Sequence, residues 1–328
     1  MPGATPGAPA VLVTGAGGFV GRQLCRWLTD RRWAVRAGHR SAPLQGAPDG
    51  SPFVIGDMAG NVDWHAAVSG MHAVVHLAAR VHVMRDLATD PLAAFRAANV
   101  TASERLARAA AAAGVRRFVY LSSVKVNGEA TPGRPYDEQD PPAPQDAYGV
   151  SKWEAEQALR RVAAETGLEV AIIRPPLVYG PGVGANFRRL MGLAEKGLPL
   201  PLGAVRNRRS LLYVGNLCSA IEACLEHPAA AGKTFLVSDG EDISSAGLIR
   251  RLARLLEAPD RLWPLPPALL RLLGALTGKS AEVSRLLDSL AVDGAGIRRQ
   301  LHWHPPFSLE QGLAATVADY RHNTASVL

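Results

Sequence analysis

Residues 10–21 read Ala-Val-Leu-Val-Thr-Gly-Ala-Gly-Gly-Phe-Val-Gly, an apolar run that ends in a cluster of glycines. The apolar run predicts a buried parallel strand, and the amphipathic segment after it predicts a helix. Glycine suits the turn between them because it reaches positive φ and lets bare backbone approach a ligand. The N–H groups that open the helix favour a phosphate. The stretch therefore predicts a dinucleotide-binding turn.

Strand-like runs alternate with helix-like runs through the first half of the chain. We expect strands at residues 11–14, 34–37, 53–55, 73–77, 118–122 and 170–174, and helices at residues 21–30, 101–113 and 148–166. This alternation is typical of βαβ units. It predicts an α/β fold with a Rossmann-type, doubly wound parallel sheet, in which the glycine cluster follows the first strand.

The character of the chain changes after Pro175, where proline and glycine become frequent and strands become scarcer. We expect residues 1–9 to be a disordered lead-in, residues 10–175 to form a dinucleotide-binding domain, and residues 176–328 to form mainly a smaller substrate-binding lobe. A strand near residues 234–237 is expected to return to the sheet. The lobe should cover the carboxyl edge of the sheet, where such folds bind ligands.

The charge of the chain restricts its partners. It has 36 basic and 29 acidic residues, a net charge of +7, without a block of five like charges. Basic residues are not interleaved with aromatic ones as in nucleic-acid grooves, so we expect no nucleic-acid partner. Small polyanions such as dinucleotides and nucleotide-sugars are compatible with the charge. The histidines show no metal-ligand spacing, and no metal is expected.

Three cysteines, Cys25, Cys218 and Cys224, indicate buried free thiols in a reducing compartment. The N-terminus has no signal-peptide pattern. The most apolar late stretch, residues 262–276, is too short to span a bilayer. We interpret it as a packing helix, with contact to a membrane surface as the alternative. The expected location is therefore the cytoplasm.

Tyr148 and Lys152 lie four residues apart, on one face of the helix predicted at residues 148–166. A free tyrosine is a poor base at neutral pH, and a neighbouring cation lowers its pKa toward the working range. Such pairs also occur by chance on exposed helices. Here, however, the strand predicted at residues 118–122 leads into Ser123 at the same edge of the sheet. The three residues are therefore a candidate catalytic set.

Taken together, these motifs resemble the extended short-chain dehydrogenase/reductase family, especially its nucleotide-sugar epimerase and reductase branch. The resemblance covers nearly the whole chain. The matching segments are Thr14-Gly15-x-x-Gly18-x-x-Gly21, Gly56-Asp57, His76-Leu77-Ala78-Ala79, Asn99-Val100, Ser122-Ser123, Tyr148-x-x-x-Lys152 and Arg174-Pro175-Pro176-Leu177-Val178-Tyr179-Gly180-Pro181-Gly182.

The resemblance implies a role for each residue of the catalytic set. Tyr148 would be the general acid/base, Lys152 would hold the nicotinamide ribose and lower the Tyr148 pKa, and Ser123 would donate a hydrogen bond to the reacting oxygen. The cofactor would supply the hydride. The implied cofactor-binding residues are Gly15, Gly18, Phe19, Val20, Gly21, His39, Arg40, Asp57, Met58, Leu77, Ala78, Ala79, Asn99, Ser122, Tyr148, Lys152 and Pro175.

The end of the second predicted strand departs from the pattern expected for NAD. An acid there would bind the free 2′-hydroxyl of the adenosine ribose, but this chain has His39 followed by Arg40. An arginine can bind a 2′-phosphate through two hydrogen bonds. The cofactor is therefore NADP or NAD, with NADP favoured.

The resemblance also implies substrate-binding roles for Ser123, Asn186, Phe187 and Arg209, the last on a nucleotide diphosphate. Leu177 replaces the sugar-contacting asparagine of family epimerases, so the sugar stays open. Lys125 is a candidate phosphate contact or an ordinary loop charge. The segment after Ser123 lacks the paired acids of family dehydratases, which makes dehydration improbable.

Three functions follow from the resemblance. The first is a 4-epimerase acting on a UDP-hexose or UDP-N-acetylhexosamine. The second is an NADPH-dependent reductase of a UDP-4-keto-6-deoxyhexosamine, which Arg40 favours. The third is a cofactor-sensing protein without activity, which the retained Tyr148 and Lys152 disfavour. A homodimer through the helices near residues 101–113 and 148–166 is also implied.

Overall fold

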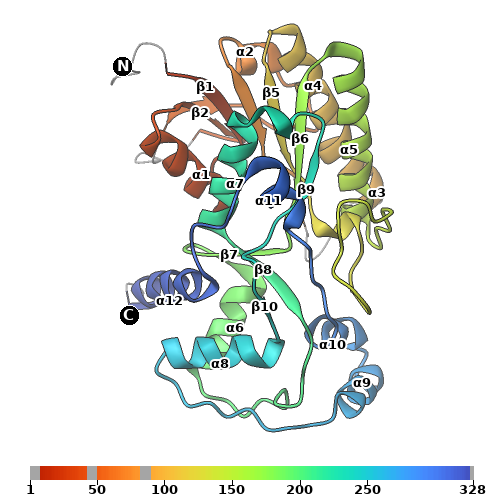
Figure 1. The fold of residues 1–328 in the computed structure, drawn as a ribbon, viewed down its shortest axis with the longest axis vertical. Helices are drawn as coiled ribbons and strands as arrows, with labels where there is room; N and C mark the ends of the chain where they lie inside the picture. The colour runs from red at the N-terminus through yellow and green to blue at the C-terminus, as the bar shows by residue number, and fades with distance from the viewer. Residues whose placement is uncertain (1–7, 43–49, 82–89, 326–328) are drawn as a thin grey trace.

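The computed structural model describes residues 8–42, 50–81 and 90–325 (Figure 1). Residues 1–7 of the expected lead-in lie outside the described residues. The fold has a large parallel sheet in its upper part and a smaller lobe with a second sheet in its lower part (Figure 1). The upper part contains the glycine-rich turn.

Seven strands form the large sheet, in the order β3-β2-β1-β4-β5-β6-β9, and each neighbouring pair is parallel. The strand order reverses at β1, which creates the crevice where doubly wound folds bind ligands. The predicted α/β fold is confirmed. The strands are β1 (Ala10–Thr14), β2 (Ala34–His39), β3 (Ser51–Val54), β4 (Ala73–His76), β5 (Arg117–Leu121), β6 (Glu169–Arg174) and β9 (Thr234–Leu236).

Alternate side chains of β1 point to opposite faces of this sheet. Val11 and Val13 belong to the hydrophobic cluster that includes residues of α1 (Phe19–Asp30) and α7 (Val214–Glu226). Leu12 belongs to the opposite cluster, with residues of α2 (Trp64–Val68), α4 (Ala102–Ala112) and α5 (Ala147–Thr166). Helices therefore cover both faces, which explains why β1 is apolar at every position that faces them.

The predicted helices differ slightly at their ends. The first begins two residues earlier than expected, because the exposed Gly18 is its N-cap. The helix expected at residues 101–113 is α4, and a π-helical turn at Arg96–Thr101 connects it to the short α3 (Pro91–Phe95). The turn contains the buried Asn99, which matters for the site.

The lower lobe contains a three-stranded sheet in the order β10-β8-β7. Its strands are β7 (Leu177–Tyr179), β8 (Arg209–Tyr213) and β10 (Asp242–Ile243), none of which is among the strands expected from the alternating pattern. Around them lie α6 (Ala185–Glu195), α8 (Ser245–Leu255), α9 (Pro267–Leu276), α10 (Ser280–Leu287) and α12 (Leu309–Ala325).

Three later elements return to the upper part of the molecule. Helix α7 shares a hydrophobic cluster with α1, β9 pairs with β6, and α11 (Ala295–Leu301) contributes Ile297 and Leu301 to the same cluster. The chain therefore passes between the two parts more than once. A division of the chain at residue 175 stays a prediction.

All three cysteines are buried free thiols, as predicted. Burial raises the pKa of the Cys224 thiol to about 12 and also raises that of Cys218. Within the described ranges, no helix has the length and hydropathy needed to cross a bilayer.

The packing helix expected at residues 262–276 is only partly correct. Helix α9 covers residues 267–276, and most of its leucines are exposed.

Candidate active site

The glycine-rich turn has the close packing that its sequence predicts. Gly15 has φ +72°, and a Cβ atom there would lie 2.9 Å from the backbone nitrogen of Ala78. A Cβ at Gly21 would lie 2.1 Å from the carbonyl oxygen of Gly15. Gly17 and Gly18 leave backbone exposed at the N-terminus of α1, which continues with the half-buried Phe19 and Val20. This turn fits the pyrophosphate of a dinucleotide.

A buried hydrogen-bond chain fixes β4 beside this turn. The Thr14 hydroxyl lies 2.6 Å from His76 Nδ1, and His76 Nε2 lies 2.9 Å from the Ser103 hydroxyl. Burial, with the nearby Lys152, lowers the pKa of His76 to about 3, so the ring is neutral. The Ala78 N–H donates to Thr14 Oγ1 at 3.3 Å. The segment with Leu77, Ala78 and Ala79 is thereby held against the glycines.

Asn99 connects this segment to α5, the helix that contains Tyr148 and Lys152. Its Oδ1 accepts from the Arg80 N–H at 2.7 Å, and its Nδ2 donates to the Arg80 carbonyl and the Ser151 hydroxyl, both at 3.0 Å. Ser151 in turn donates to the carbonyl of Tyr148 at 2.8 Å. The Asn99 side chain, which was expected to contact the cofactor, instead forms hydrogen bonds within the protein. These bonds align the segment after β4 with the start of α5.

The residues expected at the adenosine end pair with each other. Arg40 Nη2 lies 3.1 Å from Asp57 Oδ2, and both side chains are well exposed. His39 ends β2 near the turn, since a Cβ at Gly17 would lie 3.3 Å from its Nδ1. Met58 packs against the core beside Asp57. The arginine expected to select a 2′-phosphate therefore has a carboxylate partner, which weakens the argument for NADP.

The candidate catalytic pair, Tyr148 and Lys152, lies in the first turns of α5. Asp146 caps this helix, its Oδ1 accepting from the Gly149 N–H at 2.7 Å. Tyr148 is half-buried and meets Phe95 edge to face, with ring centroids 6.2 Å apart. Lys152 is 1% exposed, and its Nζ lies 4.2 Å from the centre of the Tyr120 ring. Cation–π contact therefore stabilises a lysine that water hardly reaches.

The pKa values of this pair differ from the sequence argument. Burial lowers the pKa of Lys152 to about 7, against an upward contribution from Glu156. Burial raises the pKa of Tyr148 to about 12, and the Asp146 carboxylate contributes to that rise. The expected lowering of the Tyr148 pKa by Lys152 is therefore wrong for this structure, because desolvation of the phenolate dominates.

Ser122 and Ser123, adjacent at the end of β5, form different hydrogen bonds. The buried Ser122 hydroxyl donates to Glu156 Oε1 at 2.6 Å. The half-buried Ser123 caps the short 3-10 turn Val124–Val126, its Oγ accepting from the Lys125 N–H at 3.2 Å. The Ser122 side chain therefore binds the protein interior, whereas Ser123 lies at the sheet edge, where the candidate catalytic set is expected.

The partner of Ser122 is part of a buried ionic cluster that was missed. Glu156 is fully buried, and its carboxylate accepts from Arg174 Nε and Nη2 at 2.9 and 2.6 Å. Arg174 Nη1 donates to Asn127 Oδ1 at 3.1 Å. The sequence held one signal for Glu156, since it lies four residues after Lys152 on the same helix. The cluster connects the Ser123 strand, the catalytic helix and β6.

Lys125 is an ion-pairing residue of the loop. Its Nζ lies 2.7 Å from Glu129 and 2.5 Å from Asp146. A Cβ at Gly149 would lie 2.9 Å from the Lys125 carbonyl oxygen. The segment after Ser123 is thus fastened to the helix turn that contains Tyr148.

The expected substrate residues lie in different environments. Asn186 is exposed in the first turn of α6, whereas Phe187 is buried and stacks on Tyr179 with ring centroids 5.5 Å apart. Arg209 on β8 donates from Nη1 to the carbonyls of Arg285 and Asp288, at 2.9 and 3.1 Å.

Leu177 is exposed at the start of β7. Pro175 is buried, its carbonyl accepting from the Val124 N–H at 3.0 Å.

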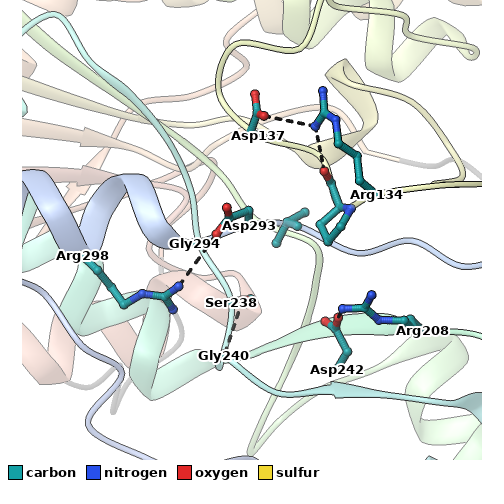
Figure 2. Close-up of a pocket in the computed structure, with 11 residues that line it drawn as sticks. Arg134, Asp137, Arg208, Ser238, Gly240, Asp242, Asp293, Gly294 and Arg298 are labelled. Carbon is teal, nitrogen blue, oxygen red and sulfur yellow. Dashed lines mark hydrogen bonds and ion pairs between the residues drawn. The ribbon is translucent and has the colours of Figure 1, made fainter.

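A separate cavity of about 370 Å³ contains none of the predicted site residues (Figure 2). Three ion pairs line it, namely Arg134–Asp137, Arg208–Asp242 and Arg298–Asp293. Each arginine has its own carboxylate partner: the first pair lies within the loop after β5, the second joins the residue before β8 to β10, and the third lies at the start of α11. Among the described residues, no cluster of three or more potential ligands could hold a metal ion.

The glycine-rich turn and the set Ser123, Tyr148 and Lys152, on a doubly wound sheet, define a dinucleotide-dependent oxidoreductase of the short-chain type. Residues 11–238 match the model of the NAD-dependent epimerase/dehydratase family. The chain is 43% identical over 310 residues to a UDP-glucose 4-epimerase from Vibrio cholerae, with 94% of each chain covered.

Two further matches agree. An N-acetyl-α-D-glucosaminyl-diphospho-ditrans,octacis-undecaprenol 4-epimerase from Escherichia coli O157:H7 is 29% identical, covering 80% of this chain and 82% of its own. The structure of MoeE5 in complex with UDP-glucose and NAD is 26% identical, with a TM-score of 0.76 over 96% of this chain and 99% of that one. The chain belongs to the NAD-dependent epimerase/dehydratase family, among the extended short-chain dehydrogenases/reductases.

Proposed function

We propose that this protein is an NAD-dependent 4-epimerase of a UDP-hexose or UDP-N-acetylhexosamine. The observation that carries the proposal is the 43% identity to a UDP-glucose 4-epimerase across 94% of both chains. The complex of MoeE5 with UDP-glucose and NAD supports the same substrate and cofactor classes. It supports NAD rather than the NADP favoured by the sequence.

The proton chemistry is assigned to Tyr148 and Ser123. Tyr148 Oη takes the proton of the sugar C4 hydroxyl and later returns it to the C4 carbonyl oxygen. Ser123 Oγ donates a hydrogen bond to that oxygen, where negative charge develops. When bound, NAD would supply the reversible hydride transfer at C4 that epimerisation requires. The tethers from Lys125 to Asp146 and Glu129 support a fixed distance between the two side chains.

Lys152 is assigned to the cofactor ribose and to the charge of the site. Its low pKa, about 7, means that a new hydrogen-bonding or anionic partner favours the ammonium form. A charged Lys152 beside Tyr148 would stabilise the phenolate that proton transfer requires. In the protein alone, burial keeps the pKa of Tyr148 at about 12.

Arg209 is assigned to the diphosphate of the substrate, and Asn186 to the same end of it. The guanidinium of Arg209 is half-buried, and the carbonyls of Arg285 and Asp288 orient it through Nη1. A planar, oriented guanidinium suits two phosphate oxygens. Phe187 supports this end of the site through its stacking on Tyr179 rather than through an exposed ring.

A second candidate function is the NADPH-dependent reduction of a UDP-4-keto-6-deoxyhexosamine. The observation that favours it is β2, which ends without an acid and is followed by an 80% exposed arginine, Arg40. Arg40→Ala distinguishes the two functions. It would raise the KM for NADPH at least ten-fold in a reductase and leave a bound NAD unaffected in an epimerase.

The test begins with protein purified without added cofactor. We expect a released nicotinamide nucleotide that chromatography identifies as NAD, and conversion of UDP-glucose or UDP-N-acetylglucosamine to its C4 epimer, followed by NMR. Protein that contains no nucleotide and consumes NADPH only with a 4-ketosugar would identify the reductase. Turnover of neither substrate would refute both functions.

We also propose that the protein is a cytoplasmic homodimer. The helices α4 and α5 carry exposed charged side chains, including the pair Arg108–Glu165 and Glu154 of α5, which pairs with Arg96 in the π-helical turn before α4. Light scattering should give twice the chain mass of 34.7 kDa.

A further inference from the structure

Helix α9 carries a continuous apolar stripe on its outer surface. Leu269, Leu272, Leu273 and Leu276 follow one another at helical spacing and are 45, 55, 52 and 75% exposed. Trp263, shortly before the helix, is 47% exposed. We call these five residues the α9 face. Apolar side chains at this exposure gain little from folding, so the four leucines, which share one side of the helix, indicate an interaction surface.

The attachment of α9 explains why this face points outward. Its opposite side packs on α10, where a Cβ at Gly274 would lie 2.8 Å from Val283. Leu270 and Val283 pack against a small core cluster of the lobe. Trp263 has a fixed backbone, since its N–H donates to the Leu200 carbonyl and its carbonyl accepts from the Gly203 N–H. The hairpin α9–α10 lies at the lower right edge of the molecule (Figure 1), away from the large sheet.

The chain segment that contains the α9 face has basic charges, and two of its basic side chains, Arg261 and Lys279, have no ion pair among the described residues. Between Asp260 and Glu282 the chain has three charged residues, Arg261, Arg271 and Lys279, and all are basic and exposed. Arg271 is paired with Asp288 at 2.6 Å, which holds its guanidinium beside the stripe. An apolar stripe with a tryptophan and a basic fringe is the pattern of helices that lie in the interface of an anionic membrane.

The size of the face argues against a second copy of the chain as its partner. A ten-residue helix is about 15 Å long and about 10 Å wide, a footprint on the order of 150 Å². A stable protein interface buries about 800 Å² on each partner. A lipid surface has no such minimum, because affinity grows with each apolar side chain and each basic group that reaches it.

We propose that the α9 face docks the protein onto the surface of an anionic lipid bilayer. The helix lies in the plane of the membrane, with its leucines and Trp263 in the headgroup region and Arg261, Arg271 and Lys279 near the lipid phosphates. Its ten residues are too few to cross the bilayer, so the contact is peripheral and reversible. The proposal does not depend on the reaction assigned above.

Vesicle flotation tests this proposal with the full-length protein and without any sugar substrate. We expect the protein to float with vesicles of equal parts phosphatidylglycerol and phosphatidylcholine, and at least ten times less with phosphatidylcholine alone. Leu272→Ser combined with Leu276→Ser should reduce binding to the anionic vesicles at least ten-fold. Lys279→Glu should reduce it about three-fold. Elevated salt should weaken binding, because it screens the basic fringe.

Leu193→Ser is the matched control, because Leu193 is also an exposed leucine of the lobe, on α6. It should bind vesicles like the unmodified protein. Trp263→Phe should remove a blue shift of tryptophan fluorescence on the anionic vesicles, which reports the location of the indole directly. An unchanged melting temperature would show that the double variant is folded. If the double variant does not fold, the single variant Leu276→Ser replaces it in the flotation experiment.

The proposal is overturned if the unmodified protein does not float with the anionic vesicles, or if the double variant floats equally well. It is also overturned if the double variant converts a larger oligomer to a smaller one in light scattering, since a second copy would then occupy the face.

Discussion

Helices α5 and α9 place their side chains in opposite environments. On α5, polar groups that normally face water are buried, including Lys152, Ser151 and Glu156. On α9, leucines that normally face the core are exposed. Burial makes the α5 groups depend on one another, because each needs a partner to offset desolvation. The α9 leucines are exposed and apolar, so they need no polar partner in the folded chain. We propose that the buried polar groups of α5 take part in the reaction and that the exposed leucines of α9 bind a membrane surface.

The largest effect should come from Tyr148→Phe, which removes only the hydroxyl that transfers the proton. We expect kcat to fall about 1000-fold, as for the loss of a general acid/base. Bound NAD should be retained, because the phenyl ring still meets Phe95. Turnover measured by NMR and nucleotide content measured by chromatography check the two halves of this prediction. Unchanged turnover would exclude Tyr148 from the proton transfer.

The buried cluster of α5 is tested by Glu156→Gln. This change leaves Arg174 charged and buried without its anionic partner, which should lower the free energy of unfolding by about 3 kcal/mol. Glu154→Gln on the same helix is the control, because its pair with Arg96 is exposed and should contribute less than about 1 kcal/mol. Thermal unfolding of the three proteins measures the difference. Equal melting temperatures would mean that burial of the cluster does not matter.

Lys152 should make the stability of the cofactor-free protein depend on pH. An unfolded lysine titrates near pH 10.4, whereas the pKa of Lys152 is about 7 in the folded chain. Between these values the unfolded state binds more protons, so the free energy of unfolding rises with pH, and it levels off below pH 7.

The rise assigned to Lys152 between pH 7 and pH 9 is about 2 kcal/mol. The free energy of unfolding is measured with denaturant at the two pH values, for the unmodified protein and for Lys152→Met. Its increase from pH 7 to pH 9 should be about 2 kcal/mol smaller in Lys152→Met than in the unmodified protein. An identical pH dependence in both proteins would place the folded pKa of Lys152 near its ordinary value.

The smallest effect should come from Leu273→Ala on α9. Because its side chain is half exposed, the free energy of unfolding should change by less than about 0.5 kcal/mol. The counterpart Leu159→Ala on α5 removes a fully buried leucine and should cost about 3 kcal/mol. Denaturant unfolding compares the two. A large loss from Leu273→Ala would show that α9 is covered in the folded protein.

The sequence predicted those parts of the fold in which local pattern and burial agree. The strand predicted at residues 11–14, the glycine turn and the helix predicted at residues 148–166 each have a chemical pattern that few other structures satisfy. The short strands β7, β8 and β10 were missed, because two to five residues are too few for a clear periodicity.

Side-chain direction was the other property that the sequence could not supply. Two adjacent serines look alike in the sequence, yet Ser122 donates to the buried Glu156 and Ser123 lies at the sheet edge. The apolar composition of residues 262–276 predicts a helix but does not reveal which side is covered. That depends on Gly274, whose missing side chain lets α10 approach.

The three buried thiols have a practical consequence. Cys25, Cys218 and Cys224 are at most 1% exposed, and burial raises the pKa of Cys218 and Cys224 above the range in which maleimides react. The native thiols of the folded protein should therefore not react with maleimides. A single cysteine placed at Leu276 could then carry a spin label or fluorophore, without prior removal of the native thiols.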